Sequence, residues 1–249
     1  MTLRKIWVIS MFENYFDSFL DSGIIGSTFR NERGDGVRFE FKVIHLPTFS
    51  KKGFKGVDDS PFGGGVGMIM RPDILEKALV EGIHRAGNYT NTLKDDLHVI
   101  CPLPRGRAWD NDYAKSFALQ HLGDESDKDL VFVCGRYEGI DERFLDQYVD
   151  EYISMGDFIL TGGELAVMTI LDSAMRFSPG VLGNKLSNVD ESFAGNYLEH
   201  ALYTRPQVFN SQSVPDELIS GDPKKILKFK EKSSISITQK YRPDLLDNK

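Results

Sequence analysis

The stretch that decides the fold is "VFVCGRYEGIDERF", Val131 to Phe144, in which an apolar run leads into a glycine-bounded loop and then into a charged helical pattern. A short apolar run of this kind is typical of a strand buried on both faces of a parallel sheet. The loop carries Arg136 and Glu138, but it has neither the lysine of a phosphate loop nor the glycine triplet of a dinucleotide site. The stretch therefore predicts an α/β unit and leaves open which ligand its loop holds.

Strand and helix patterns alternate through the first two thirds of the chain. Because alternation of this kind is typical of a parallel sheet covered by helices on both sides, we expect ligands to bind beyond the carboxyl ends of the strands. The expected strands are 5–12, 38–46, 97–103 and 129–134, and the expected helices are 71–87, with Pro72 in the first turn and Gly87 at the end, and 139–152.

Three glycine-rich loops are candidates for the ligand site: 58–68, 134–139 and 154–165. The first, "DDSPFGGGVGM", is either a plain flexible turn or part of a site, and it is not a Walker loop because Met68 and Ile69 stand where lysine and serine or threonine are needed. In the third, the Gly162-Gly163 pair follows Gly156 closely and precedes a buried helical pattern. Glycines so close together predict a tight crossing of chain segments, since backbone can pass near backbone or ligand there.

Composition sets the class of protein. With 249 residues, 41% of them hydrophobic, the chain can form one large domain, or one domain and a small appendage. Cys101 and Cys134 match no metal-ligand spacing, so we expect buried, reduced thiols. The N-terminal apolar run is too short for a signal peptide and no apolar stretch approaches membrane-spanning length, which predicts a cytoplasmic protein.

Charge and pattern divide the chain after residue 183. A net charge of −7 argues mildly against a nucleic-acid partner. The segment from residue 201 onward is nevertheless locally basic, because it contains nine lysines and arginines and six acidic residues. Residues 184–196 are polar and predict a linker or mobile loop. We therefore expect three parts: a ligand-binding domain over 1–183, this linker, and a small domain of short helices with a basic face over 197–249.

Several motifs together resemble one family. "SPFGGGVGMIM", "VCGRYEGIDERF", "SMGDFILTGGELAVMTILDSAMRFSPGVLG", "SFAGNYLEHALYTRPQVF", "VPDELISGD" and "RPDLL" occur here in the order seen in the bacterial tRNA (guanine-N1)-methyltransferases of the TrmD type, members of the SPOUT superfamily. The resemblance covers nearly the whole chain. It implies an α/β domain with a deep trefoil knot, an exception to the rule against knots, and a small, mostly helical C-terminal domain.

The resemblance also implies a cofactor and its site. The family binds S-adenosylmethionine in the knot and works as a homodimer with a shared active site. Backbone groups would hold the adenine and ribose of a positively charged sulfonium compound, which has no phosphate to bind. The cofactor residues carried over are Leu103, Pro104, Gly135, Glu138, Met155, Gly156, Asp157, Phe158, Ile159, Leu160, Gly162 and Gly163. The family's magnesium dependence is possible here too, but no ligand cluster in the sequence indicates a site.

Transfer of a methyl group to N1 of guanine needs a base for the N1 proton and stabilisation of charge on O6. The residues similar to the family's arginine and aspartate are Arg176, in "AMRFSPG", and the acidic position before Ser192-Phe193. That position is Glu191, where the family has aspartate, and Asp190 directly precedes it. Either carboxylate can be the base. Glu191 is favoured slightly, because a loop that becomes ordered only when the substrate binds can accommodate a side chain one methylene longer than aspartate.

The substrate implied is a tRNA with guanine at position 37, just 3′ of the anticodon, where a base can be splayed out and read on its edges. Asp58, Asp59, Gly64 and Gly65 resemble the side of the pocket that receives the guanine. Val66, Ala201 and Pro223 depart from the family pattern and put the shape of that loop and of the tRNA-binding domain in question. The alternatives are a related knotted methyltransferase with another RNA target and a catalytically weak RNA-binding protein.

Overall fold

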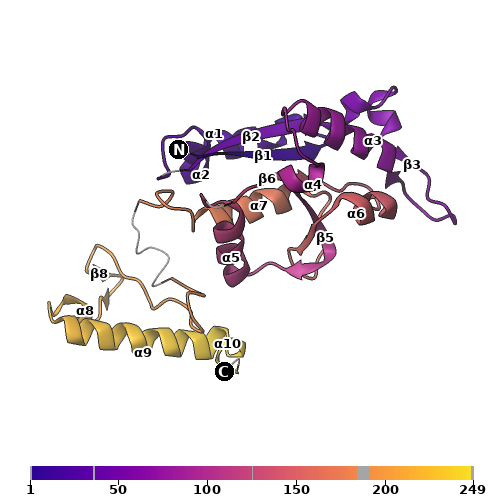
Figure 1. Cartoon of the computed structure of the whole chain (residues 1–249). Coiled ribbons are helices and arrows are strands. Elements are labelled where there is room, and N and C mark those ends of the chain that lie inside the picture. Colours follow the sequence, from indigo (N-terminus) through magenta and orange to yellow (C-terminus); the bar gives the residue numbers. More distant parts are fainter. Residues whose placement is uncertain (1, 36, 125, 184–190, 248–249) are drawn as a thin grey trace. The chain divides into compact units, whose positions relative to one another are not determined.

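A computed structural model describes residues 2–35, 37–124, 126–183 and 191–247 of the chain. The chain divides into two compact units, residues 1–183 and residues 184–249 (Figure 1). In the part of the chain that the structure describes, no helix combines the length and apolar character that crossing a membrane requires.

The first unit is built on a parallel sheet of five strands in the order β2-β1-β6-β5-β7. A separate antiparallel pair, β3 and β4, bounds the first glycine-rich loop. The strands are β1 (Thr2–Ser10), β2 (Val37–His45), β3 (Asp58–Asp59), β4 (Ile69–Met70), β5 (Leu97–Ala108), β6 (Asp129–Val133) and β7 (Glu151–Ser154).

Helices cover both faces of this sheet, because β1 and its neighbours are apolar on both. Ile6 and Val8 of β1 belong to one buried cluster, which also holds side chains of α2, α5 and α7. Trp7 and Ile9 belong to a second cluster on the other face, with α3 and α6. The helical elements are η1 (Glu13–Phe16), α1 (Asp17–Asp21), α2 (Gly23–Phe29), η2 (Leu46–Phe49), η3 (Gly53–Gly56), α3 (Pro72–Lys77), η4 (Ala78–Arg85), α4 (Leu93–Asp96), α5 (Asn111–His121), α6 (Glu142–Tyr148) and α7 (Glu164–Met175).

The α/β class and the four expected strands are confirmed, and one expected helix is wrong in part. The pattern over 139–152 predicted a continuous helix, but α6 ends at Tyr148 and the backbone is already extended at Val149. The segment continues as β7, whose Glu151 pairs with Ile100 of β5. The apolar spacing fits a helical face, yet the sheet supplies backbone partners for residues 151–154 that a longer helix would lose. The other expected helix, 71–87, occurs as α3 followed by η4, a wider π-helical turn.

The expected crossing of chain segments lies where the loop before α7 passes the end of β6. The Gly163 N–H donates to the Gly135 carbonyl at 3.0 Å. A Cβ atom on Gly163 would stand 2.8 Å from the Cα of Cys134, which only a glycine avoids. Such close passage is what a threaded chain requires, and the trefoil knot itself stays a prediction.

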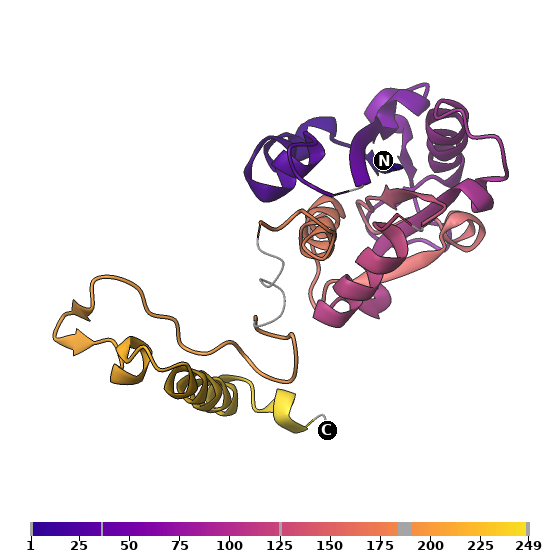
Figure 2. The same cartoon turned by 60° about the vertical axis from the view of Figure 1, so that its left-hand side comes forward.

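The second unit is organised around one long helix, drawn in yellow in Figure 2. The short helices expected here are therefore wrong in length, since α9 (Pro223–Tyr241) has 19 residues and is flanked by α8 (Asp216–Ile219) and α10 (Asp244–Asp247). A hairpin of β8 (Val208–Phe209) and β9 (Gln212–Ser213) precedes them. Side chains of α9 fix the segment before the hairpin, because Thr238 accepts from the Leu198 N–H and Ser234 donates to the Leu198 carbonyl.

Both cysteines are buried and free, as expected, and this predicts their reactivity. Burial raises the pKa of the Cys101 thiol to about 12 and raises that of Cys134 well above its usual value. The thiolate is the reactive form, so neither group should react with a disulfide reagent in the folded protein at pH 8. We expect two thiols per chain to titrate only after unfolding in guanidinium chloride. Rapid reaction of either thiol in the native chain would contradict the buried positions.

Candidate active site

The loops at the carboxyl ends of β5, β6 and β7 enclose a pocket of about 350 Å³. Its position agrees with the general rule that open parallel sheets bind ligands beyond the carboxyl ends of their strands. The lining residues are Pro102, Leu103, Pro104, Gly135, Arg136, Tyr137, Glu138, Gly139, Ile153, Ser154, Met155, Gly156, Phe158, Ile159, Leu160, Thr161, Gly162, Gly163 and Ala166.

Every predicted cofactor residue except Asp157 is among these lining residues. Residues from three loops that lie far apart in the sequence are thus brought together around one cavity. The sequence reasoning did not assign Arg136, Tyr137 or Thr161 to the site. Their positions inside the glycine-rich loops were the available signal, because a loop that encloses a ligand presents most of its residues to it.

Two glycines let the loops close over one another. Gly139 and Gly156 adopt positive φ values of 134° and 127°, which side chains of L-residues disfavour. Tyr137, two residues before Gly139, also has a positive φ of 59°. A non-glycine residue in this conformation is uncommon and marks a loop whose shape its surroundings impose.

A buried ion pair supports the floor of the pocket. The Nη2 of Arg136 lies 2.7 Å from the Oε2 of Glu164. The Nη1 of Arg136 donates a hydrogen bond of 3.1 Å to the Thr161 carbonyl. Glu164 begins α7, is only 1% exposed, and accepts a hydrogen bond of 2.7 Å from the Ser10 hydroxyl. A Cβ atom on Gly162 would stand 2.3 Å from the guanidinium carbon of Arg136, so Gly162 leaves the room that the arginine occupies.

The first glycine-rich loop joins the pocket through Glu138. The Glu138 N–H donates to the Met68 carbonyl at 3.0 Å, and a Cβ atom on Gly67 would stand 2.3 Å from the Glu138 side chain. The loop leaves β3 at Asp58 and Asp59 and returns in β4, so it lies beside the pocket wall. Gly64 and Gly65, the other residues predicted for the guanine side, lie in it; a Cβ atom would meet nothing within 4 Å at Gly64 and only Pro61 at 3.9 Å at Gly65. Their role stays a prediction.

Of the predicted catalytic residues, Arg176 belongs to the same unit as this pocket but does not line it. Arg176 is half-buried and directly follows the C-terminal end of α7. The N-terminal end of α7, at Glu164, lies beside the pocket. Twelve helical residues separate the two ends, a length of about 18 Å at 1.5 Å per residue. Glu191 belongs to the second unit, where its carbonyl accepts from the Ala194 N–H. Asp190 lies outside the described residues.

Comparison with known proteins identifies the family. The sequence model of the tRNA (Guanine-1)-methyltransferase TrmD family matches residues 4–248. This chain belongs to that family. Relatives named tRNA (guanine-N(1)-)-methyltransferase include one from Dechloromonas aromatica, 39% identical over 96% of this chain and 88% of the relative. Another, from Brevibacillus brevis, is 38% identical over 98% of this chain and 91% of the relative.

Membership of the TrmD family confirms the resemblance that the motifs indicated and makes the chain an enzyme of this methyltransferase family.

The possible magnesium dependence concerns a different part of the chain. Among the described residues, one group of three metal-ligand side chains occurs, His98, His121 and Glu151. Two imidazoles and one carboxylate do not fit magnesium, which prefers oxygen ligands and retained waters.

Proposed function

We propose that the protein methylates N1 of guanine at position 37 of tRNA, just 3′ of the anticodon, with S-adenosylmethionine as methyl donor. The observation that carries the proposal is the pocket of a TrmD-family chain into which two of the glycine-rich loops, 134–139 and 154–165, converge with residues 102–104. Bound there, the cofactor supplies an electrophilic methyl group on a positively charged sulfonium.

The pocket suits a sulfonium nucleoside for physical reasons. Glycine backbone and the apolar side chains of Leu103, Ile159 and Leu160 offer flat contact surfaces for adenine and ribose. Glu138 is the acidic side chain in its wall and complements a positive charge. No lysine lines this pocket among the described residues, as expected for a ligand without phosphate.

On the substrate side, we assign three tasks to residues of this chain. Arg176 would donate hydrogen bonds to the O6 of guanine as negative charge develops there, because guanidinium stays protonated and presents a donor fork. Glu191 or Asp190 would take the N1 proton. Asp58, Asp59 and the glycine loop would receive the flipped base next to Glu138.

A homodimer with shared sites would bring Arg176 to a pocket that it does not reach in its own chain. A rigid helix about 18 Å long holds the arginine away from the cavity of its own chain. We therefore infer that Arg176 acts at the pocket of a second copy, which a twofold dimer supplies reciprocally. The dimer would work in the cytoplasm, and the second unit would bind the tRNA backbone through Arg205, Lys224, Lys225, Lys228 and Lys230.

The proposal is tested by incubating the purified chain with labelled S-adenosylmethionine and tRNA transcripts that carry guanine or adenine at position 37. We expect methyl incorporation into the guanine transcript alone. Incorporation into both transcripts would indicate a methyltransferase with another RNA target. Binding of tRNA without any incorporation would indicate an RNA-binding protein with little catalysis.

The base is assigned by replacing Glu191 and Asp190 separately with alanine. Loss of general base catalysis should slow single-turnover methylation by about 10²- to 10⁴-fold in one variant and leave the other near wild type. Raising the pH should partly restore the methylation rate of the slow variant, because the guanine N1 proton is then lost to solvent. Equal and small effects in both variants would remove the base from this loop.

A methyl group at the chain crossing should weaken cofactor binding and slow methylation. In Gly163→Ala the new Cβ would stand 2.8 Å from the Cα of Cys134, so the two segments must separate by about 1 Å to reach ordinary contact. A displacement of that size can lower the rate about 100-fold. Calorimetric titration with S-adenosylmethionine or its demethylated product measures the loss. Gly183→Ala is the control, since its Cβ meets only a distant atom of Arg33 at 3.9 Å, and it should bind normally.

A further inference from the structure

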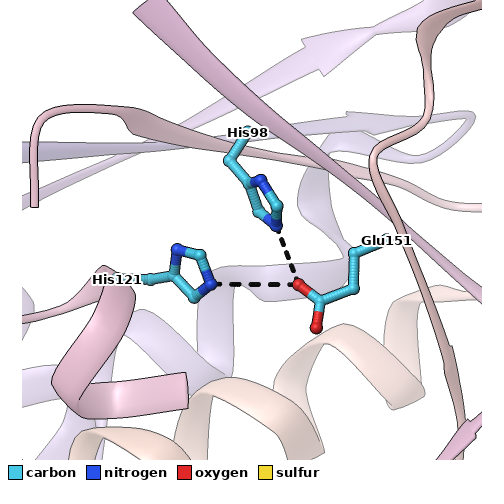
Figure 3. A group of neighbouring side chains, drawn as sticks. All are labelled: His98, His121 and Glu151. Carbon is cyan, nitrogen blue, oxygen red and sulfur yellow. Dashed lines mark hydrogen bonds and ion pairs between the residues drawn. The ribbon is translucent and has the colours of Figure 1, made fainter. Parts of the chain in front are cut away.

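A second cluster of chemically active side chains lies at the opposite ends of the strands that form the pocket. Figure 3 shows His98 and His121 facing one oxygen of Glu151. His98 is the second residue of β5, Glu151 is the first residue of β7, and His121 is the last residue of α5. Three elements thus contribute one side chain each, and the proposed methyl transfer uses none of them.

We propose that His98, His121 and Glu151 form a binding site for a zinc-class divalent metal ion. The His98 Nε2 lies 2.8 Å and the His121 Nε2 lies 3.9 Å from the same Glu151 oxygen. All three ligand atoms lie within 4.8 Å of one another. Ligands of a tetrahedral zinc ion at bonds of about 2.0–2.1 Å stand about 3.3 Å apart, so small side-chain rotations would complete the site.

The surroundings supply the outer contacts that metal ligands need. The Tyr113 hydroxyl donates to the other oxygen of Glu151, which fixes the carboxylate. The Asp150 carboxylate lies 4.0 Å from the Nδ1 of His98, so the two must approach by about 1 Å to form the hydrogen bond that orients a metal-bound imidazole. The two imidazole rings stack at 4.4 Å, and the ring of Phe117 packs 4.7 Å from His121.

Ligand type and burial select the metal. The three side chains are 17–21% exposed, which leaves one open side for a water as fourth ligand. Two imidazoles and one carboxylate suit zinc, cobalt or nickel rather than magnesium. The ion would tie α5 to the strands that lead to Pro102 and Ile153 of the pocket.

The site is tested on the full chain after removal of metals with a chelator. Titration with zinc chloride in a calorimeter should give one ion per chain, and cobalt chloride should give the visible absorption bands of a four-coordinate site. His121→Gln and His98→Gln should each weaken zinc binding by more than the roughly 10- to 100-fold that loss of an outer contact causes. Millimolar magnesium chloride should not displace the zinc.

The matched control is His84→Gln. His84 has a similar exposure of 18% and faces one carboxylate, that of Asp96 at 3.4 Å, but it has no third ligand partner among the described residues. This variant should bind zinc as wild type does. The melting temperature without metal, compared for all variants, shows whether each is folded. Absence of saturable zinc and cobalt binding in the wild-type chain, or an equal loss in His84→Gln, would overturn the proposal.

Discussion

Replacing Glu164 with alanine is expected to lower the free energy of unfolding by about 3 to 5 kcal/mol, the range found when one partner of a buried ion pair is removed. The variant leaves the guanidinium of Arg136, whose side chain is only 15% exposed, without its carboxylate. It also removes the acceptor of the Ser10 hydroxyl. Urea unfolding followed by circular dichroism measures the change.

The matched control for this prediction is Glu32→Ala. Glu32 also pairs with an arginine, Arg30, at 2.9 Å, but both side chains are well exposed. Exposed pairs contribute only about 0–1 kcal/mol, so this variant should unfold nearly as wild type does. The double variant Arg136→Ala with Glu164→Ala should lose less stability than the two single losses added together, because neither charge is then left unpaired. Similar losses in Glu164→Ala and Glu32→Ala would refute the role of the buried pair.

The strands could be predicted from sequence because each is a short apolar run with little competing pattern. The run "DLVFVC" became β6, and its register beside β1 buries side chains on both faces. The boundary between α6 and β7 could not be predicted in the same way. Val149 and Tyr152 continue the helical spacing of Phe144 and Leu145, and pairing with β5 decides their conformation. Information of that kind lies in residues about 50 positions away.

In the candidate site, too, some features could be predicted from the sequence and others could not. The glycine loops could be assigned through the family motifs, since glycine is required wherever the chain passes close to itself, as at Gly163. The partnership of Arg136 with Glu164 joins positions 28 residues apart, and neither pattern nor composition indicates it. The cluster of His98, His121 and Glu151 combines ends of three elements, so only the fold reveals it.

Replacing Arg176 with alanine is expected to lower kcat for methylation of the guanine-37 transcript by about 10²- to 10³-fold, the loss seen when one donor to a developing oxyanion is removed. Affinity for S-adenosylmethionine should stay unchanged, because the proposed contact of Arg176 is with O6 of guanine and not with the cofactor. Arg176→Lys should remain impaired, since a single ammonium cannot reproduce the donor fork. The control Arg30→Lys alters an exposed pair and should leave the rate unchanged. A loss of cofactor affinity in parallel with kcat would instead assign Arg176 a structural role.

Mixing two inactive variants separates the two places where Arg176 can act. Arg176→Ala keeps an intact pocket, and Gly163→Ala keeps an intact arginine. If the arginine acts at the pocket of the second copy, half the dimers after subunit exchange are mixed, and each holds one site with both parts intact. Activity should then rise to about a quarter of the wild-type value. If the arginine served its own chain, every site would lack one part and mixing would restore nothing. The length of α7, which sets Arg176 about 18 Å from Glu164, favours the first result.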